Sequence, residues 1–405
     1  MANFSSSPGV KLNEIDNSFI TPIPVSAGAA IIGPTVKGPV ELPTVVTSYS
    51  DFKDKFGGSF TSGSNIFSYL TSISAYNYFT EGGDSLLVAR VVSGTYTAAS
   101  SSATVATSTS ASIVFETLSK GTIMNTGTDF DGDGILTNGT IDNIKFEIAG
   151  SNIDTGTFNV LVRQGNDKNS DKIILETFNK VSLDPNQSNF ISKVIGDQVV
   201  TYDSETNQID ITSGEFANIS RYIRVKSIPN LTTDYFDNAG VAKTTLKEHI
   251  PVNGTGSFGG ALGDVIAGAN FYKDISAGGD LNTQGLVGTD YDNMISLLGN
   301  INDYQFNVLS TPGLNNGSHT LQISSIINNT IERGDNIFVM DTIRYASTLA
   351  NALTQAATRN TSYAATYFPW LRVQDPETGK IVFVPPSTMI PGVYAHNDKV
   401  ANTWN

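Results

Sequence analysis

Residues 26–39 read SAGAAIIGPTVKGP, which predicts a buried strand from Ala27 to Ile32 that ends at Gly33-Pro34. A second apolar run, SLLVARVV at 85–92, has almost no polar positions. Runs of this kind are typical of strands in a sheet that is covered on both faces. The first stretch therefore predicts a buried strand, and the second predicts a strand of an α/β sheet that is covered on both faces.

Two helices are expected between these strands. DFKDKFGG (51–58) predicts a short helix that ends at Gly57. Residues 62–83 predict a longer one, with Ser64 as its N-cap and Gly82-Gly83 as its end. Its inward face would consist of Ile66, Leu70, Ile73 and Tyr76.

The same alternation returns in the last third of the chain. Strands are expected at 304–311, 336–340 and 363–373, and helices at 319–334 and 341–359. Asp341 would cap the last helix, with Ile343, Leu349, Ala350 and Leu353 facing inward. Alternating strands and helices indicate a largely parallel sheet with right-handed crossovers.

A different pattern fills the region from Gly94 to about residue 235. A low-complexity Ser/Thr/Ala stretch at 93–112 is followed by short alternating runs: IDNIKFEIAG, TFNVLVRQG, KIILETFNKV, QVVTYD and NQIDITSG. This spacing predicts an antiparallel β sandwich or a barrel-like domain. We therefore expect a multidomain α+β chain, with residues 95–235 inserted as an outer β domain into an α/β core domain formed by 21–94 and 236–405.

The composition supports folded domains and argues against several classes of protein. The 405 residues are 39% hydrophobic, enough to bury sizeable cores. A formal charge of −14, from 24 basic and 38 acidic residues, opposes binding to nucleic acid. The absence of cysteine excludes disulfides and thiolate zinc sites. Since no signal-peptide pattern and no run of about 18 apolar residues occurs, we expect a soluble chain, made in a cytoplasm, without membrane insertion.

Residues 1–20 are predicted to form an extended N-terminal arm. They are polar, and their few spaced apolar positions are too few to form a core alone. Such a segment becomes ordered by pairing with another chain, and strand addition to a neighbour's sheet is the mode we expect. The candidate inter-subunit residues are Pro8, Gly9, Val10, Leu12 and Ile15.

The stretch DFDGDG at 129–134 is the candidate ligand site. Asp129, Asp131 and Asp133, followed by Gly134, match the opening half of an EF-hand loop. The match stops halfway, because Thr140 stands where the bidentate glutamate belongs. An Asp/Gly-rich turn that joins β segments is the favoured interpretation. A structural Ca²⁺ ion held by the three aspartates is thus the one metal that the sequence suggests, and no cofactor is required.

The residues do not indicate an enzyme. The three histidines, His249, His319 and His396, lie in different segments. Neither a Gly-x-Ser-x-Gly elbow nor a Gly-x-x-x-x-Gly-Lys phosphate loop occurs. GTGSFGG (254–260) matches Gly-x-Gly-x-x-Gly, but a dinucleotide site needs a strand before it and a helix after it, and neither is predicted. A flexible loop is the favoured interpretation of that stretch.

A family resemblance extends along the chain. SPGVKLNEID (7–16) is followed by the blocks 26–58, 76–92, 138–148 and 158–198, and finally by 360–405 with its Pro-Trp, Pro-Pro-Ser and Gly-Val-Tyr-Ala elements. Taken in this order, the blocks resemble contractile phage tail sheath proteins from Ser7 to Asn405. Ile141 and Asp142 depart from the pattern, since the family has Trp-Gly at these positions.

The resemblance implies a structural subunit that polymerises helically around an inner tube and contracts to drive it through the host envelope. Its partners would be neighbouring sheath subunits, in hexameric rings stacked as a helix, together with the tail tube, baseplate and tail terminator proteins. It would be assembled in the bacterial host cytoplasm and would belong to the virion tail. The family's last block continues into a C-terminal domain, which this chain is expected to lack.

A second interpretation stays open at this point. The acidic, Ser/Thr-rich composition and the Asp129 cluster also suit a Ca²⁺-dependent, β-rich surface adhesin that binds glycans.

Overall fold

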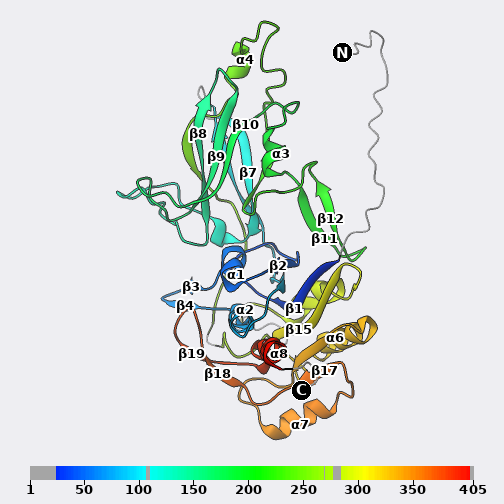
Figure 1. Cartoon of the computed structure of the whole chain (residues 1–405). Helices are drawn as coiled ribbons and strands as arrows, with labels where there is room; N and C mark the ends of the chain where they lie inside the picture. The colour runs from blue at the N-terminus through cyan, green and yellow to red at the C-terminus, as the bar shows by residue number, and fades with distance from the viewer. Residues whose placement is uncertain (1–23, 106–109, 269, 277–283, 402–405) are drawn as a thin grey trace, which may run out of the picture.

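The computed structural model describes residues 24–105, 110–268, 270–276 and 284–401. Within these ranges the chain forms an α/β body and, at one end of it, a body made mainly of β-strands (Figure 1). This mixed, multi-sheet architecture agrees with the predicted α+β class. None of the helices in the described ranges is long and apolar enough to cross a membrane.

A six-stranded sheet forms the centre of the α/β body. Its order is β17-β16-β15-β1-β5-β2. These strands are Ala364–Thr366, Ile337–Asp341, Tyr304–Asn315, Val25–Gly33, Leu86–Arg90 and Thr44–Val46. β1 pairs in parallel with β15 on one side and with β5 on the other, and β16 and β17 continue the parallel set, whereas β2 is antiparallel to β5. The expected parallel sheet is therefore present, with the strand of SAGAAIIGPTVKGP in its middle.

Alternate side chains of β1 pack into two hydrophobic cores, one on each face of the sheet. Ala29 and Ile31 pack with residues of α1 (Tyr49–Phe56) and α2 (Leu70–Thr80) on one face of the sheet. Ala30 and Ile32 pack with α5 (Asp292–Leu297) and α6 (Thr320–Arg333) on the other. Because helices cover both faces, the central strands need apolar residues at nearly every position, and all five residues of β5 are buried.

The predicted helix ends are confirmed at two positions where a glycine follows the helix. α1 is followed by Gly57 at φ 76°, and α6 by Gly334 in the left-handed region. The predicted start of the second helix is wrong. Residues 60–67 form a hairpin, β3 (Phe60–Ser62) and β4 (Asn65–Phe67), so Ser64 lies in its turn. Gly63, with φ 60°, allows this tight turn, and α2 begins only at Leu70.

The predicted helix at 341–359 is shorter than expected. α7 (Leu349–Ala357) is capped by Thr348, whose side chain accepts the N–H of Asn351. Asp341 is not a cap but the buried end of β16. Its carboxylate accepts the N–H and the hydroxyl of Ser387, at 3.1 and 2.6 Å. Contrary to the prediction, Leu349 and Leu353 of α7 face outward.

The end of the described chain packs back onto the α2 face. The expected last strand is divided into β17 and β18 (Leu371–Gln374), and β18 forms a hairpin with β19 (Ile381–Val384) around a turn at 375–379. The 3₁₀ helix η3 (Pro386–Thr388) and α8 (Ile390–Val400) follow and contact α2.

Two antiparallel sheets that share one apolar core make up the β body. Their orders are β10-β9-β8-β14 and β13-β7-β6. The strands are Ala98–Thr104 (β6), Ala111–Lys120 (β7), Ile144–Asn152 (β8), Thr157–Gln164 (β9), Ile174–Ser182 (β10), Ile223–Ser227 (β13) and Gly254–Ser257 (β14). A separate hairpin is formed by β11 (Val199–Asp203) and β12 (Gln208–Ser213), and the short helices are Ile191–Ile195 (α3) and Thr244–Lys247 (α4).

The β body continues past residue 235. β14 pairs with β8, and Phe258 and Ala261 belong to the core of the β body. The N–H of Thr97 donates to the carbonyl of Leu262 at 3.1 Å, so the chain enters and leaves this body side by side. The sequence-based boundary at residue 235 leaves β14 out, because its glycine-rich residues carry no strand signal.

Polar contacts join the two bodies. Lys37 forms an ion pair with Asp142 at 3.3 Å. Buried Arg90, at the end of β5, donates from Nη1 to the carbonyls of Gly38 and Lys120, at 2.6 and 2.8 Å. Burial lowers the pKa of Arg90 to about 10. A cavity of about 470 Å³ lies between the bodies beside these contacts.

The buried carboxyl of Asp341 makes stability depend on pH. Burial raises its pKa to about 7, although hydrogen bonds from Ser387 act in the opposite direction. An unfolded aspartate titrates near about 3.9. The native state therefore binds the proton more tightly, and this contribution to stability is full below about pH 4 and is lost as the pH rises through about 7.

Asp341→Asn keeps an acceptor for Ser387 but does not titrate. We expect its free energy of unfolding to change less than that of the wild type between about pH 5 and about pH 8. Urea denaturation at the two pH values measures this, and an unchanged pH dependence in the variant would contradict the assignment.

Candidate functional site

The aspartates of DFDGDG lie in a tight turn of the β body. Phe130 and Leu136 form an antiparallel bridge, so the segment folds back on itself. The carboxylate of Asp131 accepts the backbone N–H groups of Asp133 and Ile135, both at 2.9 Å. This is the ordinary way in which an aspartate stabilises a turn without a metal.

The three carboxylates are not gathered around a common point. Asp131 is used within the turn, and Asp133 forms a 3.5 Å ion pair with Lys168 between exposed side chains. In the part of the chain that the structure describes, no group of three or more His, Asp or Glu side chains is arranged to hold a metal ion. Calcium binding by Asp129, Asp131 and Asp133 therefore stays a prediction.

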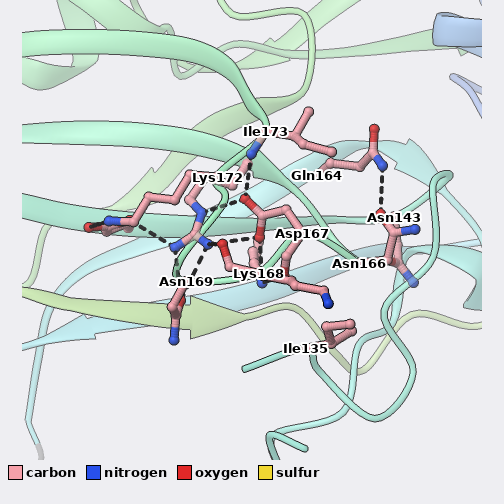
Figure 2. A network of polar contacts seen from close by, with 12 residues as sticks. Ile135, Asn143, Gln164, Asn166, Asp167, Lys168, Asn169, Lys172 and Ile173 are labelled. Carbon is pink, nitrogen blue, oxygen red and sulfur yellow. Dashed lines mark hydrogen bonds and ion pairs between the residues drawn. The ribbon is translucent and has the colours of Figure 1, made fainter. Parts of the chain in front are cut away.

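A buried network of charges lies next to this turn (Figure 2). The side chains of Lys145, Arg163 and Asp167 are fully buried. Arg163 donates to both carboxylate oxygens of Asp167, from Nε and Nη2, each at 2.8 Å. Nζ of Lys145 lies 2.6 Å from Oδ1 of Asp167, and the N–H of Ile173 donates to Oδ2 at 2.9 Å.

The network reaches the turn at one end and solvent at the other. The ring of Phe130 lies 5.8 Å from Nζ of Lys145. At the other end, Glu147 accepts from Arg163 at 2.8 Å and from the partly exposed Lys172 at 2.7 Å. Each charged side chain of the network is thus paired, so we assign it to the fold of the β body rather than to a ligand.

The carboxyl of Asp167 is held in its ionised form. Burial acts to raise its pKa, but the hydrogen bonds from Arg163 and Lys145 outweigh burial and hold the pKa below its usual range. Two buried cations therefore face a buried anion, and removing that anion would leave them uncompensated.

The arm candidates Pro8, Gly9, Val10, Leu12 and Ile15 lie outside the described residues. The structure does describe the strand to which they lead. β1 begins at Val25, whose N–H donates to the carbonyl of Asp303 at 2.8 Å. Because β1 is bonded to β15 and to β5, residues 1–20 are covalently continuous with a central strand and not with an edge strand.

The glycine motif is part of a sheet. Gly254 and Gly256 lie in β14, so the predicted flexible loop is wrong at these positions. A β-carbon on Gly256 would lie 2.2 Å from the ring of Phe146, so a residue with a side chain does not fit there. The antiparallel pairing of β14 with β8 also differs from the parallel strand of a dinucleotide site.

His319 has a packing role in the α/β body. Its Nδ1 accepts the N–H of Asn315 at 3.2 Å, and its Nε2 lies 3.0 Å from the carbonyl oxygen of Ser276. The neutral ring with a proton on Nε2 satisfies both contacts. Burial accordingly lowers the pKa of His319.

Comparison with known proteins gives a limited result. No family model and no curated protein matches the chain. A solved sheath tail protein from Listeria innocua is similar at 11% identity and a TM-score of 0.45, over 93% of this chain and 57% of that one. A sheath tail protein from Desulfitobacterium hafniense is similar at 11% identity and a TM-score of 0.40, over 98% of this chain and 62% of that one. The chain thus spans less than two thirds of either protein.

Replacing the buried anion of the network tests its role in stability. Asp167→Ala leaves Lys145 and Arg163 without their main counter-charge, and we expect a loss of about 3–5 kcal/mol in the free energy of unfolding. Lys172→Gln removes a partly exposed member and should cost less than about 1 kcal/mol. Urea denaturation followed by circular dichroism measures both, and equal losses would show that burial of the charges is not the cause.

Two substitutions at Asp131 separate a turn from a metal site. Asp131→Asn keeps an oxygen for the two N–H groups and should retain wild-type stability, whereas Asp131→Ala should lose about 1 kcal/mol. A calorimetric Ca²⁺ titration tests the metal directly. Binding heat that is present in the wild type and absent from Asp131→Asn would establish the site, and a wild type that gives no heat would remove it.

Proposed function

We propose that the chain is a structural subunit of a contractile tail sheath. The ordered sequence blocks from Ser7 to Asn405 support this proposal, as described above. The structural observation that carries it is the position of β1. The segment with the inter-subunit candidates leads directly into the central strand of the six-stranded sheet.

This attachment suits a part that transmits force. A pull on residues 1–20 passes into β1, which is hydrogen-bonded along both sides and covered on both faces. An edge strand is bonded on one side only and would separate more easily. An arm that adds as a strand to a neighbouring copy would therefore link the centre of its own subunit to the sheet of the next.

Repetition of that link generates the assembly. A head-to-tail contact that does not close on itself produces a helical polymer. In this proposal, hexameric rings of neighbouring subunits stack as a helix around a tail tube protein, between baseplate and tail terminator proteins, in the tail of a virion assembled in the bacterial cytoplasm. A baseplate signal shortens the sheath through rigid-body rotation of subunits and drives the tube through the host envelope.

The proposal needs neither catalysis nor a cofactor, because the energy is stored in the interfaces at assembly. Apolar side chains on the surface support an assembling role. Leu349 and Leu353 on α7 are 56% and 63% exposed, and Leu321 on α6 is 78% exposed. No observation on the described residues favours the alternative of a Ca²⁺-dependent adhesin, since the aspartates of its site are not gathered.

Electron microscopy of the full chain tests the proposal. We expect tubes or stacked six-fold rings in negative stain, and persistent monomers would overturn the sheath assignment. Deleting residues 1–20 removes the arm but keeps β1, so the variant should unfold cooperatively and fail to polymerise.

A matched pair of variants tests the arm without shortening it. Leu12→Ser with Ile15→Ser removes apolar positions and should weaken polymerisation, whereas Asn13→Ser between them should not. If tubes persist after the deletion and in the double variant, the role of the arm is wrong while the sheath assignment stands.

A further inference from the structure

Cations and aromatic rings gather on one surface of the α/β body. We call it the basic–aromatic surface and define it by Lys273, Arg344, Tyr345, Trp370, Arg372 and Phe383. These residues come from the segment 270–276, the loop after β16, and the β18–β19 hairpin with the residue before it. The β18–β19 hairpin lies at the opposite end of the molecule from α4 (Figure 1).

The rings of this surface are held in place. The centroid of the Tyr345 ring lies 5.5 Å from that of Trp370 and 5.4 Å from that of Phe383. The indole N–H of Trp370 donates to the carbonyl of Ile343 at 3.1 Å. A platform of fixed rings loses little conformational entropy when a partner binds.

The cations border the rings. Nζ of Lys273 lies 5.8 Å from the centroid of Tyr345, and Arg372 is the cross-strand neighbour of Phe383. Arg344 donates from Nε to buried Asp274 at 2.7 Å, and its side chain is 62% exposed. A guanidinium group has five N–H donors, and the bond to Asp274 uses only some of them.

An open hollow of about 490 Å³ adjoins the rings. Its lining includes Lys273, Arg344 and Tyr345, together with the polar side chains of Asn270, Ser347 and Asn351. Among the residues that line this hollow, Lys273 and Arg344 are cations and Asp274 is the one carboxylate, which is buried and already bonded to Arg344. This local excess of positive charge contrasts with the formal charge of −14 on the whole chain.

We propose that the basic–aromatic surface binds an exposed acidic loop of a second copy of this chain. The inference rests on the proposed function, because it requires that copies assemble, and it adds a contact that does not involve the arm. Tyr, Trp and Arg are the residues that carry most of the energy in protein interfaces. Guanidinium groups bind carboxylates in a bidentate manner, and the rings supply apolar contact area.

Charge complementarity selects the occupant. Each copy carries 38 acidic against 24 basic residues, so a neighbouring copy presents mainly carboxylates. A nucleic acid would also suit cations among rings, but its phosphates would be repelled by the rest of the surface.

Charge reversal at Arg372 tests this inference. The side chain of Arg372 is exposed, and Lys180 is an exposed cation on β10 of the β body, so Lys180→Glu makes the same charge change elsewhere. We expect Arg372→Glu to raise the protein concentration needed for assembly by about tenfold or more, and Lys180→Glu to leave it unchanged. Sedimentation velocity at low and high salt measures assembly, and unchanged thermal unfolding of both variants shows that they are folded.

Cross-linking identifies the occupant. A carbodiimide joins lysine amines to carboxylates in contact, and a mixture of ¹⁵N-labelled and unlabelled copies distinguishes bonds between copies from bonds within one. We expect Lys273 to be joined to an Asp or Glu of another copy, and the product to decrease in Arg372→Glu.

Each outcome decides the inference. If the wild type and Arg372→Glu assemble equally, or if Lys273 is joined only within its own copy, the inference fails and the sheath proposal stands. If the wild type never assembles, both fail. Binding of a single-stranded oligonucleotide that is lost in Arg372→Glu would assign the surface to nucleic acid and overturn the inference.

Discussion

The parallel pairing of β1 with β5 and β15 is the constraint on which the rest of the structure depends. Parallel neighbours need crossover connections, and these are right-handed. From β1 the chain moves to β5 on one side, and β15, β16 and β17 then follow on the other. Right-handed crossovers that run in opposite directions along the sheet place their helices on opposite faces. α1 and α2 therefore cover one face and α6 covers the other, and each face of β1 packs in its own core.

The central strands and the glycine-ended helices could be predicted because their signals are local. β1, β5 and β16 read as strands since both faces are buried, and Gly57 and Gly334 mark helix ends by their own backbone preference. The start of α7 could not be predicted in the same way. Asp341 has the residue type of a cap, but its hydrogen-bond partner, Ser387, is supplied from far along the chain.

The candidate site shows the same limit. Alternation along β8 places Lys145 on the outward face, yet this side chain is fully buried, because Asp167 and the ring of Phe130 cover it. No local sequence pattern predicts that these residues bury Lys145. The aspartates of DFDGDG suit both a turn and half a metal loop, and only the structure shows that Asp131 accepts two backbone N–H groups within the turn. Likewise, Tyr345 and Phe383 meet because the β18–β19 hairpin returns to the loop after β16.

The closure of the β body by β14 has a consequence for the order in which the chain folds as it is made. All the strands of the β body are available once residue 263 has been synthesised, whereas β1 must wait for β15. Domains form during synthesis as their residues emerge, so the nested body precedes the body that surrounds it. When Thr97 and Leu262 come together, the loop between β1 and β15 is shortened by the residues that lie between them. The inserted segment thereby lowers the entropic cost of closing the central sheet.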